Sequence, residues 1–165
     1  MTIPYRHPPT MMDEAAMTRI LHAIAGTVAL LTIALFWMAT VVSELSGSTA
    51  LVVAVKTAIP WGLLVLVPAL AAAGGTGFKR AAGRRSPLIQ AKMRRMPIVA
   101  ANGLLILVPS AFYLAFKANA GAFDAAFYAV QALELVAGAV NLMLLGRNMR
   151  DGLRMVGRFR ARPIT

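Results

Sequence analysis

The chain has 165 residues, of which 59% are apolar and 14% are charged. A soluble domain has about 45–50% apolar and about 25% charged residues, so this composition excludes that class and indicates an integral membrane protein. A net charge of +11 is typical of nucleic-acid binders, but those proteins carry their cations on a soluble face, so we expect no nucleic-acid partner. The absence of cysteine excludes disulfides, thiol nucleophiles and cysteine-bound metals.

Four apolar stretches are long enough for a helix to cross a bilayer, which takes about 20 residues. The expected spans are about 20–42, 50–73, 96–116 and 125–145. They predict an all-α membrane protein, an antiparallel four-helix transmembrane bundle that forms one domain over residues 20–145. The first stretch is longer than the apolar part of a signal peptide and follows Asp13 and Glu14, so we interpret it as a retained span.

The placement of cations predicts the orientation. Of the seventeen Lys and Arg residues, fifteen lie before the first stretch, between the second and third, or after the fourth. Cations collect on the cytoplasmic side, so we expect an N-in/C-in protein of the bacterial inner membrane. Residues 1–19 then form a cytoplasmic segment and residues 146–165 a basic cytoplasmic tail.

Arginines in the loop and in the tail are candidates for contact with anionic lipid headgroups. In the tail they recur at helical spacing, which is typical of a helix lying on the inner leaflet, although a basic tail that only sets topology is the simpler explanation. The lipid-facing candidates are Arg84, Arg85, Arg94, Arg95, Arg147, Arg150 and Arg154.

Polar side chains inside the spans are candidates for function, because they are costly in lipid and usually face a partner or a cavity. They are Lys56, Asn102, Gln131, Glu134 and Asn141. The last three recur with Gly138 at steps of three and four residues, so one face of the fourth span is polar or small and should point into the bundle. Packing through amide hydrogen bonds is the simpler explanation for the amides. Depth along the spans predicts that Lys56 and Glu134 meet in the outer half; alternatively, Lys56 extends to the headgroups and Glu134 is protonated.

Two prolines in mid-span, Pro68 and Pro109, each remove a backbone donor and favour a kink. The segment Gly74-Gly75-Thr76-Gly77 resembles a phosphate loop only in composition, and we expect a flexible helix exit there.

His22 lies near the inner end of the first span and is a candidate haem ligand. The predicted four-helix membrane bundle is distantly similar to cytochrome b561-type bundles. This resemblance implies haem b held between paired histidines in the spans. The chain lacks that pairing, because its only other histidine, His7, precedes the first span. Met96 or Met143, both near inner span ends, would then supply the second ligand.

Residues 92–97 and Phe123–Arg154 resemble those of small four-helix bacterial inner-membrane proteins, a resemblance that implies no activity. Soluble-enzyme motifs are missing, so we expect no catalysis. Three functions compete: a non-enzymatic subunit or accessory protein that acts through helix contacts as a homo-oligomer or within a larger complex; a haem- or quinone-linked electron-transfer protein using His22; and a small oligomeric proton-coupled transporter using Glu134 and Lys56.

Overall fold

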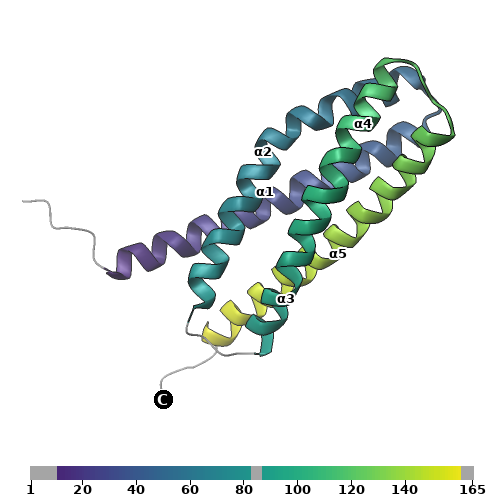
Figure 1. Ribbon diagram of the computed structural model, residues 1–165. Coiled ribbons are helices and arrows are strands. Elements are labelled where there is room, and N and C mark those ends of the chain that lie inside the picture. Colours follow the sequence, from purple (N-terminus) through teal and green to yellow (C-terminus); the bar gives the residue numbers. More distant parts are fainter. Residues whose placement is uncertain (1–10, 83–86, 161–165) are drawn as a thin grey trace, which may run out of the picture.

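The computed structural model describes residues 11–82 and 87–160, and all regular structure in these two ranges is helical (Figure 1). Four stretches are long and apolar enough to cross a membrane, as the sequence predicts: Glu14–Leu45, Thr49–Ala81, Pro87–Asn119 and Ala125–Arg154. The helices are α1 (Met11–Leu45), α2 (Thr49–Ala81), α3 (Pro87–Asn102), α4 (Val108–Asn119) and α5 (Ala125–Arg160), with a π-helical segment η1 (Gly103–Leu107) joining α3 to α4. These features indicate a multi-pass membrane protein.

The helices pack as a four-membered ring in which successive spans run antiparallel. α1 packs against α2 and α5, and α4 packs against the same two helices, so α2 and α5 lie across the diagonal of the bundle. Tight turns join α1 to α2 and α4 to α5 at one end of the bundle, which we call the turn end (Figure 1). Gly47 and Gly121 take φ values of 65° and 66° in these turns, a conformation that glycine adopts without strain.

Two apolar clusters occupy the interior at different levels. Near the turn end, Leu114 and Phe127 are completely buried together with Val52 and Ala118. Toward the opposite end, a second cluster is built from Ala29, Ile33, Leu66, Val99 and Leu145. The polar side chains described below lie between and beyond these clusters, so the apolar core is interrupted along the bundle axis.

The mid-span prolines have different local consequences. Before Pro109 the helix widens into η1, whose last bond runs from the N–H of Val108 to the carbonyl of Gly103. A π-helical turn of this kind relieves the backbone where proline cannot donate. Helix α2 continues through Pro68 and also through Gly74–Gly77, so the flexible exit expected there is wrong. The helix ends only at Ala81.

The basic tail continues the fourth span. Helix α5 runs without a break to Arg160, and Asn148 and Asp151 on it are buried against the rest of the bundle. The helix indicated by the arginine spacing is therefore present, as a continuation of the fourth span and not as a separate element. Physically, the polar side chains on one face of this tail find partners on α3, which keeps the helix aligned with the bundle.

Candidate functional site

A column of polar side chains follows the inner face of α5. The exposed fractions are 4% for Gln131, 12% for Glu134, 0% for Asn141 and 4% each for Asn148 and Asp151. At 1.5 Å per residue this column covers about 30 Å, close to the thickness of a hydrocarbon core. The first three of these residues are among the intramembrane polar residues expected from the sequence. The other two continue the same three- and four-residue spacing, and that continuation was the missed signal.

The central feature of the column is an ion pair between Lys56 and Glu134. Lys56 Nζ lies 2.5 Å from Glu134 Oε2, with the two side chains 1% and 12% exposed. The ammonium also donates to Thr40 Oγ1 at 3.4 Å. The predicted meeting of these two residues is confirmed, and Lys56 does not extend to the surface. We call this pair with Thr40 the diagonal pair, because it joins α2 to α5 across the bundle.

The diagonal pair bridges two helices that are not nearest neighbours in the bundle. In the described ranges, no Cα atom of α2 lies within 8 Å of one of α5. Only a long side chain can cross that separation, and lysine has a four-carbon stem. The pair therefore forms a polar contact in the interior of the bundle, between two diagonally opposed helices.

Unsatisfied polar atoms lie close to the pair along the chain. Neither side-chain atom of the Gln131 amide, one turn from Glu134, has a hydrogen-bond partner in the described residues, and the same holds for Glu44 Oε1. Glu44 lies one turn beyond Thr40 on α1 and acts electrostatically on Lys56. Buried polar atoms normally find a partner, so this region can accept water or a solute group.

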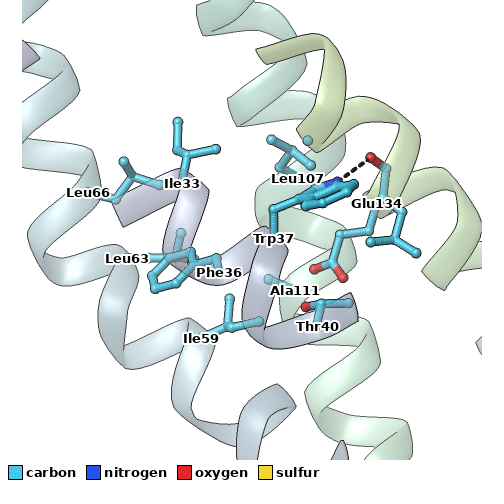
Figure 2. A pocket seen from close by; sticks show the side chains of 12 residues that line it. Ile33, Phe36, Trp37, Thr40, Ile59, Leu63, Leu66, Leu107, Ala111 and Glu134 are labelled. Carbon is cyan, nitrogen blue, oxygen red and sulfur yellow. Dashed lines mark hydrogen bonds between the residues drawn. The ribbon is translucent and has the colours of Figure 1, made fainter. Parts of the chain in front are cut away.

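A small cavity adjoins the diagonal pair on the side away from the turns (Figure 2). It measures about 50 Å³, room for a few water molecules, since one needs about 10–15 Å³. Glu134 and Thr40 contribute the polar lining, and the rest is mainly aliphatic and aromatic. The indole of Trp37 closes one side and donates to the carbonyl of Leu135 at 3.0 Å.

On the side of the cavity that is farther from the turn end, two asparagines form the next polar contact. Asn102 Nδ2 donates to Asn141 Oδ1 at 2.8 Å and to the carbonyl of Ala137 at 2.8 Å. Asn141 in turn donates to the carbonyl of Val99 at 3.4 Å. These bonds tie α3 to α5 beside the π-helical segment. The two amides predicted from the sequence as separate intramembrane residues are thus direct partners.

At the end opposite the turns, Arg95 contacts the polar column. It donates to Asp151 at 2.7 Å and to Asn148 at 3.3 Å, which places a predicted lipid-facing arginine against α5. Arg84 and Arg85 lie outside the described residues. The other lipid-facing candidates are exposed, as expected for that role: Arg94, Arg147, Arg150 and Arg154.

The predicted haem ligands occupy three different environments. Nδ1 of His22 lies 3.0 Å from the carbonyl of Ala73, and Nε2 lies 3.2 Å from Lys92 Nζ. The sulfur of Met96 accepts from Asn148 at 3.4 Å, and Met143 is 57% exposed on the outer surface of α5. Both ring nitrogens of His22 are therefore engaged, and the donor set does not fit a haem. His7 lies outside the described residues.

Within the described ranges, no group of three or more histidines and carboxylates is placed to hold a metal ion. The arrangement can hold charge in the bundle interior and can accommodate a few waters beside it. Comparison with known protein families, curated proteins and solved structures found no match to this chain.

Proposed function

We propose that this protein crosses the bacterial inner membrane four times, with both termini and the α2–α3 connection in the cytoplasm. The cation distribution supports this orientation, since the cation nearest to the two short turns, Lys117, lies in the last turn of α4 and pairs with Asp124. Aromatic side chains near the turn end, including the exposed Tyr128 and Phe116, suit an outer interface. Residues 1–19 and 146–165 are then cytoplasmic, around a single domain over 20–145.

Within that membrane, the function that the geometry supports best is proton-coupled transport by a small carrier. The observation that carries it is the diagonal pair: an ammonium that is 1% exposed held by a carboxylate in the membrane-spanning part. Ionisable residues at such depth commonly belong to proton or ion pathways.

Stability alone is a weak reason for this pair. Removing two charges from water costs energy that their attraction often only offsets, and apolar replacements of buried ion pairs are often neutral or stabilising. A Leu or Met at each position would fill the same interior without that penalty. The pair therefore suggests a use for the charge itself.

The proposed step is a proton exchange at Glu134. A proton that enters from the turn end passes through the region of Glu44 and Gln131, where unsatisfied polar atoms can hold water. Protonation of the Glu134 carboxylate neutralises it and releases the Lys56 ammonium, which then interacts with Thr40 and Glu44. Loss of the ion pair frees α2 from α5 on the diagonal, where no backbone contact holds them together. A change in this contact couples protonation to helix movement.

The test is proton flux into liposomes that contain the purified full-length protein and a trapped pH-sensitive dye. An imposed pH gradient should collapse faster than in empty liposomes, and Glu134→Gln should abolish the difference. Gln keeps the size of the side chain but cannot exchange a proton. The matched control is Asp124→Asn, which removes an exposed carboxylate immediately before the start of α5. Equal flux in wild-type, Glu134→Gln and empty liposomes would contradict the proposal.

A second candidate is a non-enzymatic subunit of a homo-oligomer or larger complex. One observation favours it: Gly74 and Gly75 on α2 have nothing within 4 Å of an added Cβ. This part of the helix surface therefore consists of small residues that no other described helix covers. Small surfaces allow close helix contact in membranes. The polar face of α5, in contrast, is used inside the chain. Co-purification with a defined complex, together with no proton flux, would favour this candidate.

A further inference from the structure

Three basic side chains from three helices lie toward the end of the bundle opposite the turns. His22 on α1 and Lys92 on α3 are in contact at 3.2 Å, across the second diagonal of the bundle. Arg80 near the end of α2 lies close enough to both to act on them electrostatically. All three side chains are half-buried. We call this group the basic cluster.

The hydrogen bonds around His22 determine how Lys92 is held. Thr76 Oγ1 donates to the carbonyl of Ala72, so it can only accept from the ring. Nδ1 of His22 therefore carries the hydrogen and donates to the carbonyl of Ala73 and to Thr76. Nε2 is then an acceptor, and it receives one hydrogen from the Lys92 ammonium. His22 is thus neutral, and it orients Lys92.

Lys92 has donors to spare in this arrangement. An ammonium carries three hydrogens, and one is used on His22. The carboxylate that acts electrostatically on Lys92 is Asp151, and that carboxylate is bound to Arg95 at 2.7 Å. No salt bridge to Lys92 is formed in the described part of the chain. A half-buried ammonium without a bound anion attracts one.

We propose that the basic cluster binds a phosphate group, with Lys92 as the direct donor, Arg80 as the supporting charge and His22 as the positioning residue. Its place at the end of the spans suits the phosphate of an anionic lipid headgroup, and a soluble phosphate ion has the same chemistry. Exposed arginines in the same region attract anions generally, whereas Lys92 is held in position by its contact with His22. This site is independent of the diagonal pair, which lies in the other half of the bundle.

The experiment measures lipid retention by native mass spectrometry of the full-length protein in neutral detergent. Phosphatidylglycerol should bind more tightly than phosphatidylcholine, and Lys92→Met should weaken phosphatidylglycerol about fivefold, the effect of about 1 kcal/mol for one cation near an anionic lipid. Lys92→Arg should restore most of the affinity. Lys79→Met, which removes an exposed cation beside Arg80, is the matched control and should change little.

His22→Phe tests the positioning role, because it removes the acceptor that holds Lys92 while keeping a ring of similar size. We expect weaker phosphatidylglycerol binding with an unchanged melting temperature. A second measurement separates the two sources of phosphate: line broadening of inorganic phosphate in ³¹P NMR without lipid shows a soluble ligand. No broadening, together with selective phosphatidylglycerol retention, shows a headgroup. Equal losses in Lys92→Met and Lys79→Met, or equal retention of both lipids, would overturn the proposal.

The lipid-binding experiment can fail or succeed independently of the proton-flux experiment. Glu134→Gln leaves the basic cluster intact, so it should retain phosphatidylglycerol like the wild type whether or not flux is lost. Conversely, a failure of phosphatidylglycerol selectivity says nothing about the diagonal pair.

Discussion

Charge in an apolar interior is stable only when it is paired, and this determines how variants of the diagonal pair should behave. Removing one partner leaves the other charge buried and costs about 3–5 kcal/mol in comparable pairs, whereas replacing both by apolar groups is often neutral. Lys56→Met and Glu134→Leu should each reduce the yield of folded protein in detergent. The double variant should recover most of that yield.

The yield is measured as the monodisperse fraction in size-exclusion chromatography after a fixed heating step. Asp124→Asn at the turn end is a control for loss of one charge, and it should keep nearly the full yield because its carboxylate is exposed. If the double variant is as damaged as the sum of the single ones, the two residues do not stabilise each other.

The asparagine contact makes a smaller contribution than the diagonal pair. Asn141→Ala removes its bonds to Asn102 and to the carbonyl of Val99, but Asn102 keeps the carbonyl of Ala137. Interhelical hydrogen bonds in membranes contribute about 0.6 kcal/mol on average, and rarely more than about 2. We expect a loss of about 1 kcal/mol in detergent unfolding. A loss above about 3 kcal/mol would show that this contact organises more of the bundle.

Individual polar residues could be predicted from the sequence where depth alone decides their contacts. Lys56 and Glu134 lie at similar depths from the turn end, so helix rise allows the two side chains to meet, and the structure shows that they do. Lateral arrangement is different, because four apolar helices can be ordered around a bundle in more than one way. For that reason the sequence did not show that His22 contacts Lys92 or that Asn102 contacts Asn141.

At the scale of the helices, the packing of α1 on α2 is tightest against the glycine at position 62. A Cβ at position 62 would overlap the ring of Phe36 on α1. Gly62→Ala should therefore destabilise the bundle by about 1–3 kcal/mol, the usual effect of overfilling a packed interior. Combining it with Phe36→Leu should restore part of the loss, because the shorter side chain leaves room.

Gly74→Ala in the same helix is the matched control for this packing effect. An added Cβ there meets nothing within 4 Å, and alanine favours a helix over glycine by about 1 kcal/mol. Thermal unfolding in detergent should show Gly74→Ala unchanged or stabilised. If Gly62→Ala behaves in the same way, the α1–α2 contact is looser than the structure shows.

The start of α5 is capped by Asp124. Its Oδ1 accepts from the N–H of Phe127 at 3.0 Å, and its Oδ2 receives a hydrogen bond from Lys117 at 2.5 Å. The Lys117 hydrogen bond, followed by the Phe127 N–H, lowers the pKa of Asp124 below its ordinary value of 3.8. A carboxyl whose pKa is lowered on folding stabilises the fold above its unfolded pKa, and that contribution is lost as the pH falls through the folded value.

Asp124→Ala should therefore lower the melting temperature at pH 7 more than Asp124→Asn, which keeps an oxygen for the cap. The difference between wild type and Asp124→Asn should shrink as the pH falls below 4 and at high salt, because the pair is exposed. If the difference in melting temperature between wild type and Asp124→Asn does not depend on pH, the charge of Asp124 makes no contribution and only its cap hydrogen bond stabilises the helix.

Helix extent was harder to predict than helix existence. Apolar length predicted four helices, and four long apolar helices are present. The span predicted from apolar length stops at Leu145, although the helical spacing of the arginines after it already indicated a helix there. That helix is continuous with the span, and Asn148 and Asp151 on it bind Arg95.

For the whole molecule, the cation distribution makes a prediction about sidedness. Both turns lie at one end of the bundle, and the ends that carry most of the cations lie at the other (Figure 1). A reporter that is active only outside the cytoplasm should therefore be active when inserted at residues 46–48 and inactive when fused to the C-terminus. A cytoplasmic reporter at the same two positions should give the opposite pattern.

Moving cations from one end of the bundle to the other should weaken the sidedness that the reporters measure. The cytoplasmic preference comes from Lys and Arg near the span ends, whereas acids contribute little. Replacing Lys79, Lys92 and Arg94 by Gln weakens the signal between α2 and α3, and adding three Lys within 120–123 creates a competing one. The combined variant should show mixed activity for both reporters, while either change alone should leave the C-terminal fusion cytoplasmic because the α5 tail retains its arginines. Equal sidedness of the turn and the C-terminus in the wild type would mean that an even number of spans, and not three, lies between them, and the four-span N-in/C-in topology would be wrong.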